Sequence, residues 1–209
     1  MNRRLSVAAM AMLSCALAFS AQAQTEPPAD PLTQIAIATL PGTSSTRLTV
    51  TSPAFGADGD IPFANTMYRT NTFPGLAWST GPKVTRSYAI VMQDPDTLFH
   101  GAPLVHWTLF NVPASMTRLE PGMTAPPEGS QYGPNGRGSS QPYRGPHTPP
   151  GPKHHYHFQV FALDTVLPKA PDIDYAGLTA AMNGHVLASG ELVGLSYADP
   201  EAKPVAPKN

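Results

Sequence analysis

The chain has 209 residues, a formal net charge of −1 and only 13% charged residues. Because 41% of its residues are hydrophobic, it lacks the low hydrophobicity and high net charge of a disordered protein. It contains no basic runs, which argues against electrostatic binding to nucleic acid. The length suits one domain with a substantial core, and a single cysteine excludes an intramolecular disulfide.

The first 23 residues have the pattern of a secretory signal peptide. Two early arginines supply positive charge, residues 5–19 are apolar, and residues 21–23 (Ala-Gln-Ala) form a small-x-small cleavage pattern. We therefore expect an exported protein, periplasmic or secreted after cleavage near Ala23, with no transmembrane segment in the mature chain. An uncleaved anchor and lipidation at Cys15 are the alternatives.

The remaining chain is predicted to divide into a flexible lead-in (24–43), one domain (44–199) and a flexible tail (200–209). Short apolar or β-branched runs in the domain predict strands. These runs are residues 48–51, 74–78, 87–93, 104–112, 155–163 and 190–197. An Ala- and Leu-rich stretch at 176–188 predicts a helix interrupted at Gly184, and residues 55–71 and 120–153 predict loops. The pattern indicates a mainly β domain with long loops.

Polar residues of the types that bind ligands or catalyse reactions collect around three successive apolar strands. Asp94-Pro95-Asp96 ends one strand, His106 lies within the next, and the turn 145–151 leads to His154 at the start of the third. We expect Asp94 to orient the imidazole of His106 and leave its other nitrogen for a ligand. Backbone N–H groups of the Gly/Pro turn would form an anion-binding nest. A buried core histidine and an ordinary Asp-Pro turn are the alternative interpretations.

Further short motifs follow along the chain. They are His106-Trp107, Asn111-Val112-Pro113, Tyr143-x-Gly145-Pro146-x-x-Pro149-x-Gly151-x-x-His154-x-Tyr156, and Gly184-His185-Val186-Leu187-Ala188 followed by Gly190-Glu191-Leu192-Val193-Gly194. In this order and spacing, residues 48–197 resemble the phosphatidylethanolamine-binding proteins, above all their bacterial Raf kinase inhibitor-like branch.

The resemblance implies a central antiparallel sheet, a second smaller sheet and one or two peripheral helices. It also implies a pocket at the sheet edge for phosphate, acetate or a phospholipid headgroup. The ligand-binding residues carried over are Asp94, His106, Gly145, Pro149, His154 and Tyr156, supported by Asp96, Trp107 and Pro146.

The sequence departs from the family pattern at three places. His147-Thr148 stands where many bacterial relatives have Cys-Pro, His155 where the family often has arginine, and Gly101 where some eukaryotic members have an aromatic residue. Loss of the guanidinium removes a bidentate donor to phosphate. We therefore expect a small anion rather than a large phospholipid.

No metal or other cofactor is expected, because strand alternation separates His155 and His157 from His154. The chain has no G-x-S-x-G, Walker or H-E-x-x-H motif, so we expect binding without catalysis. Two alternatives remain open. One is inhibition of a protein partner such as a protease, and the other is hydrolysis by the Asp/His pair with Ser139 or Ser140.

Overall fold

The computed structural model describes residues 29–202. The predicted signal peptide and most of the predicted tail lie outside this range. The helical elements are η1 (Pro31–Gln34), α1 (Ala36–Thr39), η2 (Phe63–Asn65) and α2 (Tyr175–Met182). The strands are β1 (Val50–Thr51), β2 (Gly59–Asp60), β3 (Leu76–Trp78), β4 (Ser87–Phe99), β5 (Ala102–Pro113), β6 (Arg118–Leu119), β7 (Gln131–Tyr132), β8 (His154–Leu163) and β9 (Val186–Ser196).

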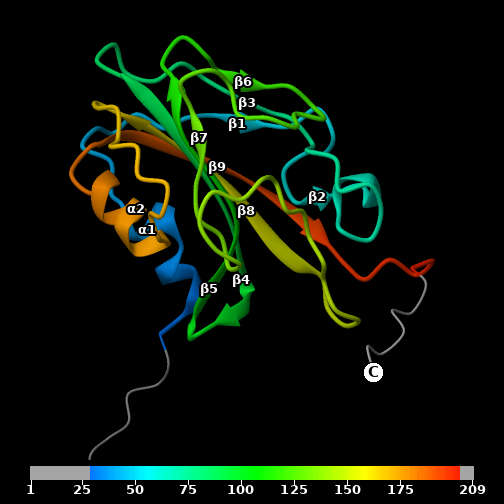
Figure 1. Ribbon diagram of the computed structural model, residues 1–209. Helices are drawn as coiled ribbons and strands as arrows, with labels where there is room; N and C mark the ends of the chain where they lie inside the picture. Colours follow the sequence, from blue (N-terminus) through cyan, green and yellow to red (C-terminus); the bar gives the residue numbers. More distant parts are fainter. Residues whose placement is uncertain (1–28, 203–209) are drawn as a thin grey trace, which may run out of the picture.

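The strands form two sheets that pack face to face. The larger sheet has the order β2-β9-β8-β4-β5-β7, and the smaller one has the order β1-β3-β6. Figure 1 shows the small sheet across one face of the large sheet, with α1 and α2 together on the opposite side. All pairings in the large sheet are antiparallel except β2 with β9. The predicted fold class, a mainly β protein with two sheets and few helices, is confirmed.

Strand alternation divides the core into two layers. Along β4, Tyr88, Ile90 and Met92 pack toward the small sheet, whereas Ala89 and Val91 pack toward the helices. The large sheet is thus buried on both faces, which explains why its central strands are almost continuously apolar in sequence.

The segment predicted as a flexible lead-in is held in place over residues 31–40. The Ala36 N–H donates to Gln93 Oε1 at 2.8 Å, and the Ile37 N–H donates to Gln159 Oε1 at 2.6 Å. Two buried glutamines of the sheet therefore accept from the first N–H groups of α1. The prediction of a loose lead-in is wrong for this part because its polar composition hid these long-range contacts.

The helix predicted at 176–188 is shorter than expected. It ends at Met182, Gly184 adopts a φ of 80°, and Val186 already begins β9. Glycine tolerates this left-handed conformation, so the chain reverses there and the following residues join the sheet. None of the helices within residues 29–202 is long and apolar enough to cross a membrane.

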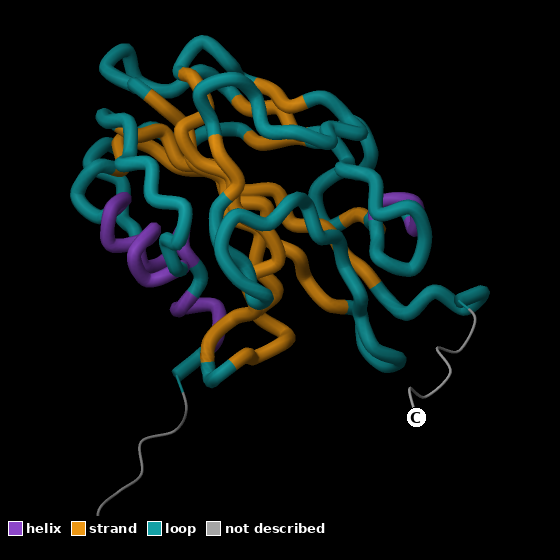
Figure 2. Tube along the Cα trace, viewed as in Figure 1, coloured by secondary structure: helices purple, strands orange, loops and turns teal. Residues whose placement is uncertain are grey.

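Strand β4 continues past the point where the sequence predicted its end. Asp94 pairs with Leu104 and Leu98 pairs with Pro103, so residues 95–97 form an insertion that bulges from the ladder. The β4–β5 hairpin closes at His100 and Gly101, which both have positive φ values, as a type I′ turn requires. The segment 120–153 is mostly irregular, as predicted, and contains only β7 (Figure 2).

We predict that Gly190→Ala destabilises the protein by about 3 kcal/mol, the upper range for overpacking a core. A Cβ at Gly190 would lie 1.9 Å from the Leu48 carbonyl oxygen, because the chain before β1 crosses β9 there. Gly56→Ala is the matched control, since its Cβ would meet nothing within 4 Å. Urea unfolding of both variants tests this, and equal stabilities would contradict it.

Candidate functional site

Asp94 lies at the start of the β4 bulge, where its carboxylate receives four hydrogen bonds. Its side chain is nearly inaccessible, at 1% exposure. Oδ1 accepts from the N–H groups of Asp96 (2.9 Å) and Thr97 (3.1 Å), and Oδ2 accepts from Thr97 Oγ1 (2.9 Å). His154 Nδ1 is the fourth partner, 2.9 Å from Oδ2. The carboxylate therefore orients His154.

His106 does not pair with Asp94, contrary to the sequence interpretation. Its side chain is 3% exposed, and neither ring nitrogen has a hydrogen-bond partner among residues 29–202. The ring packs edge-on against Tyr156, with centroids 5.1 Å apart. Backbone groups of Arg144 and Gly145 lie close enough to favour the protonated ring, but neither makes a well-aligned hydrogen bond to it.

A bulge in β5 determines the direction of His106. Met92 pairs with Trp107 and Gln93 pairs with Val105, so His106 is an extra residue on its strand. His106 and Trp107 can then both face the layer that contains Tyr156, although neighbouring strand residues normally alternate. Trp107 is fully buried against Phe73 and Tyr143 and so supports the site from the core.

Electrostatics keep the His106 ring neutral at neutral pH. Burial lowers the pKa of His106 from 6.5 to about 4; the Asp94 carboxylate opposes this effect, and the positive charge of Arg144 adds to it. A neutral imidazole offers one N–H donor and one acceptor nitrogen. The ring is therefore a polar group without a partner, placed in a largely apolar layer.

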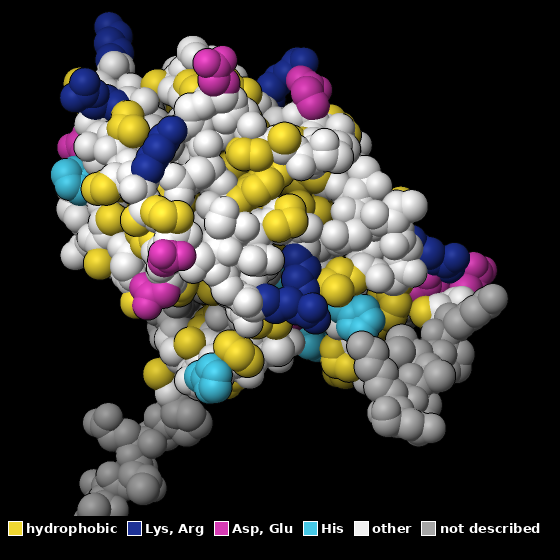
Figure 3. Space-filling view, viewed as in Figure 1, with side chains coloured by type: hydrophobic (Ala, Val, Ile, Leu, Met, Phe, Trp, Pro, Cys, Tyr) yellow, Lys and Arg dark blue, Asp and Glu magenta, His cyan; other side chains and the backbone are white. Residues whose placement is uncertain are grey.

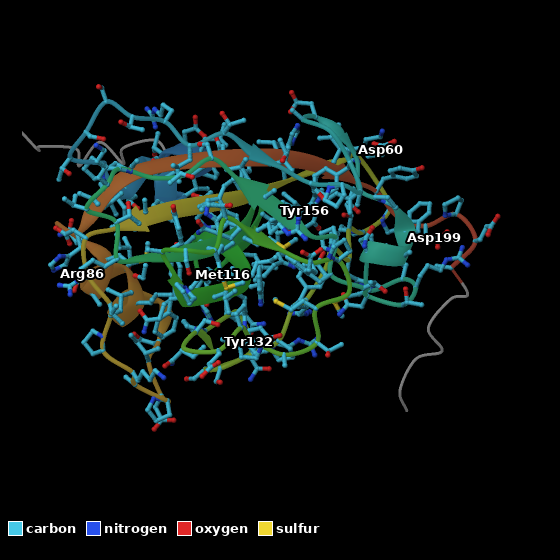
Figure 4. The ribbon with its side chains drawn as sticks, turned by 90° about the horizontal axis from the view of Figure 1, so that it is seen from above. Asp60, Arg86, Met116, Tyr132, Tyr156 and Asp199 are labelled. Atoms are coloured by element: carbon cyan, nitrogen blue, oxygen red, sulfur yellow. The ribbon has the colours of Figure 1, made fainter. Side chains whose placement is uncertain are left out.

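Tyr156 supplies a hydroxyl beside this ring. Figure 4 labels its position in the interior of the molecule. Its oxygen lies 3.0 Å from Thr148 Oγ1, and the two groups are hydrogen bonded. Burial raises the pKa of Tyr156, and the Asp94 carboxylate raises it further. The hydroxyl therefore stays protonated.

The opposite face of β8 carries a separate pair of histidines, as the alternation predicted. His155 Nδ1 lies 2.9 Å from Asp96 Oδ2, and His157 Nδ1 lies 2.9 Å from Glu191 Oε2. Within the described part of the chain, no group of three or more His, Cys, Asp or Glu residues is placed to hold a metal ion.

The turn that enters β8 is fixed by the segment 65–71. The Gly145 N–H donates to Asn71 Oδ1 (2.8 Å), and the Pro146 carbonyl accepts from the Met67 N–H (2.8 Å). A Cβ at Gly145 would lie 2.2 Å from the Asn65 carbonyl oxygen, so only glycine fits there.

These contacts leave fewer free backbone N–H donors in the turn than the expected anion nest requires. The Gly145 N–H is already occupied, and prolines at 146, 149 and 150 have no N–H. Of the N–H groups next to these prolines, that of His147 is hydrogen bonded to the Tyr156 hydroxyl. Pro149 is exposed at the outer edge of the turn, and its contact with a ligand stays a prediction.

Four residues near the site carried no signal in the sequence. Thr97 and Thr148 hydrogen bond to Asp94 and Tyr156, respectively. The Tyr68 ring stacks on His147 at 4.6 Å, and its hydroxyl donates to the Thr148 carbonyl. Arg144, next to Gly145, is half-buried. None of these residues belongs to a recognisable sequence pattern of its own, so only the folded structure shows that they lie near the site.

His106 lies outside the four hollows described, which have volumes of about 400 to 720 Å³. One of them, lined by Asp96 and His155, lies beside the bulge. The side chain of His154 reaches solvent, at 13% exposure.

Comparison with known proteins gives one consistent result. The family model for phosphatidylethanolamine-binding protein matches residues 51–198. The chain belongs to the phosphatidylethanolamine-binding protein family. A UPF0098 protein of Methanothermobacter thermautotrophicus is 39% identical over 145 residues, which cover 68% of this chain and 93% of the relative.

Two solved structures of the family superpose on this chain. The putative homologue CT736 of Chlamydia trachomatis has a TM-score of 0.67 at 29% identity, covering 74% of this chain and all of that one. YbcL of Escherichia coli has a TM-score of 0.66 at 27% identity with the same coverage.

In this family member, His155 braces the bulge where an arginine was expected from the resemblance. The His155 N–H (2.7 Å) and ring Nδ1 (2.9 Å) both contact Asp96 Oδ2. Burial alone would raise the pKa of Asp96, but these hydrogen bonds outweigh it and hold that pKa below its usual value. The bulge therefore remains anchored to β8 without a guanidinium.

We predict that His106 makes the unliganded protein sensitive to acid. The unfolded chain protonates this imidazole near pH 6.5, whereas the folded protein does so near pH 4. Between these values the unfolded state binds more protons than the folded state. The free energy of unfolding therefore decreases by about 3 kcal/mol as the pH is lowered through this window. Urea unfolding from pH 7 to pH 4, in a buffer without small anions that bind, measures this loss.

His106→Gln is the matched variant because its amide does not titrate. Over the same pH window, the free energy of unfolding of this variant should decrease by about 3 kcal/mol less than that of the wild-type protein. Parallel pH profiles for the two proteins would contradict the assigned pKa.

Proposed function

We propose that this protein binds a small anionic group, such as phosphate or a phospholipid headgroup, at His106, without catalytic turnover. The observation that carries the proposal is the His106 ring, which is 3% exposed and has no hydrogen-bond partner for either nitrogen within residues 29–202. A buried polar group without a partner costs about 1–3 kcal/mol, which a bound acceptor would offset.

The surroundings of His106 favour an anion. Arg144 contributes positive potential, and Tyr156, whose ring packs against His106, carries a hydroxyl that stays protonated. Asp94 is the nearest carboxylate, but its two oxygens already accept four hydrogen bonds. Its role is therefore to position His154 and the bulge.

Anion binding is coupled to protonation. A negative charge beside the ring raises the pKa of His106 above the unliganded value of about 4. Between pH 4 and the raised value, the complex takes up a proton that the unliganded protein lacks. Affinity therefore increases as the pH falls toward 4.

Binding without turnover is supported by the surroundings of the two site histidines. A hydrolytic site needs a nucleophile hydrogen bonded to its base. His106 has no such partner in the described region. The hydroxyl near His154 Nδ1, Thr97 Oγ1 at 3.3 Å, already donates its proton to Asp94 Oδ2 rather than to the imidazole.

We predict that inorganic phosphate binds the wild-type protein and that His106→Gln weakens this binding at least about tenfold, as expected when a charge-assisted hydrogen bond is lost. His100→Gln, at the exposed hairpin tip, is the matched control and should bind normally. Calorimetry at pH 5.5 and pH 7.5 should show tighter binding at the lower pH.

Two results would overturn the proposal. One is the absence of any response of the wild-type protein to millimolar phosphate or acetate. The other is hydrolysis of phosphate or carboxylate esters that His106→Gln abolishes, since turnover at this residue would make the site catalytic.

We also propose that the protein is exported, on the support of the signal-peptide pattern in residues 1–23. In a Gram-negative host the full-length chain should yield a periplasmic species that begins at Gln24, as read by mass spectrometry. Ala23→Phe should block cleavage, because the processing enzyme requires a small residue there. Recovery of the wild-type protein with Met1 still attached would contradict this.

A further inference from the structure

Arg144 differs from every other lysine and arginine that the structure describes. It is half-buried, whereas all other Lys and Arg residues between 29 and 202 are exposed. Its Nε donates to the sulfur of Met67 at 3.2 Å, and within the same range it forms no ion pair with a carboxylate. A partly desolvated guanidinium without an anion is unfavourable. Arg144 is therefore a cation whose counter-charge is missing from the described chain.

The position of Arg144 links it to the anion site. It precedes Gly145 in the turn, and its charge acts on both the His106 ring and the Tyr156 hydroxyl. Arg137 is tied to the same region: its N–H donates to Asn135 Oδ1 (2.8 Å), and the Asn135 side-chain amide donates to the His106 carbonyl (3.2 Å). Burial and the positive charge of Arg137 both lower the pKa of Arg144. In Figure 3 a compact group of Lys and Arg side chains lies beside exposed histidine near the lower centre of the view.

Building on the function proposed above, we propose that Arg144 and Arg137 form an outer subsite that selects ligands carrying a second negatively charged group, such as a carboxylate, beyond the anion held at His106. The ligand class is thus a small molecule with two separated anionic groups. A guanidinium fork suits a carboxylate because it can donate two parallel hydrogen bonds.

The same arrangement disfavours a ligand with an outer ammonium group. The two arginines would repel it, and Asp94 already has four donors around its carboxylate. The outer subsite therefore distinguishes ligands by the charge of the group that extends beyond the anion held at His106.

Three phosphate esters that differ only in the outer group test this selection. Phosphoglycolate carries a carboxylate, ethyl phosphate a methyl group and phosphoethanolamine an ammonium group. In the wild-type protein, calorimetry should show that phosphoglycolate binds about fivefold tighter than ethyl phosphate and that phosphoethanolamine binds weakest. This preference should decrease as salt is added.

Arg144→Gln should remove the preference, because phosphoglycolate binding weakens more than ethyl phosphate binding. Ethyl phosphate loses only the positive potential that Arg144 adds at His106. Arg144→Lys should retain part of it, because the charge remains but the fork is lost. Arg86→Gln is the matched control: Arg86 is exposed and lies at the left edge in Figure 4, well away from Tyr156 near the middle, so the preference should persist.

A second readout separates this role from a purely structural one. Because the positive charge of Arg144 lowers the pKa of His106, Arg144→Gln should raise that pKa, as followed by NMR of the imidazole. Arg86→Gln should leave it unchanged. An unchanged His106 pKa in Arg144→Gln would count against the subsite.

Different results would contradict the outer subsite and the anion site at His106. If all three esters bind the wild-type protein equally, at any salt concentration, or if Arg144→Gln keeps the preference, the outer subsite is wrong while the anion site at His106 stands. If none of the esters binds, the site at His106 is wrong and the outer subsite falls with it.

Discussion

The arrangement of this site depends on one buried imidazole that residues 29–202 leave without a hydrogen-bond partner. Buried polar groups in proteins are nearly always hydrogen bonded, because an unsatisfied group loses its interactions with water and gains none in return. His106 departs from this rule in the central sheet of a well-packed domain. The proposed function accounts for this departure, because a bound anion would supply the missing partner.

Two interruptions of the β4–β5 ladder produce this arrangement. The bulge at His106 turns the imidazole toward Tyr156, and the insertion at residues 95–97 brings N–H donors onto Asp94. Asp94 in turn orients His154 on the neighbouring strand. Long runs of paired residues flank both interruptions. Under the proposed function, this framework would hold the site ready for a small group with little reorganisation.

The sequence predicted the fold class and the neighbourhood of the site for clear physical reasons. Short apolar or β-branched runs between Gly/Pro-rich turns are characteristic of strands, and period-two alternation correctly placed His154 and His155 on opposite faces of β8. The motifs around Asp94, His106 and Tyr156 marked residues that do lie together in the structure.

The finer geometry could not be predicted, because it depends on contacts between distant segments. Whether Asp94 meets His106 or His154 is decided by two register shifts, and register is a property of paired strands. Asn71 holds Gly145 from 74 residues away, and no local pattern announces that contact. In the same way, the polar lead-in concealed an α1 whose N–H groups are satisfied by Gln93 and Gln159.

The central claim is that the His106 ring is kept without a protein partner so that it can meet an anion. A high-resolution crystal structure of the protein soaked with phosphate tests this most directly. The account predicts an anion within hydrogen-bond distance of a ring nitrogen of His106, with the Asp94–His154 contact unchanged. A site that stays empty at high phosphate, or ring nitrogens that are bonded to protein groups, would contradict it.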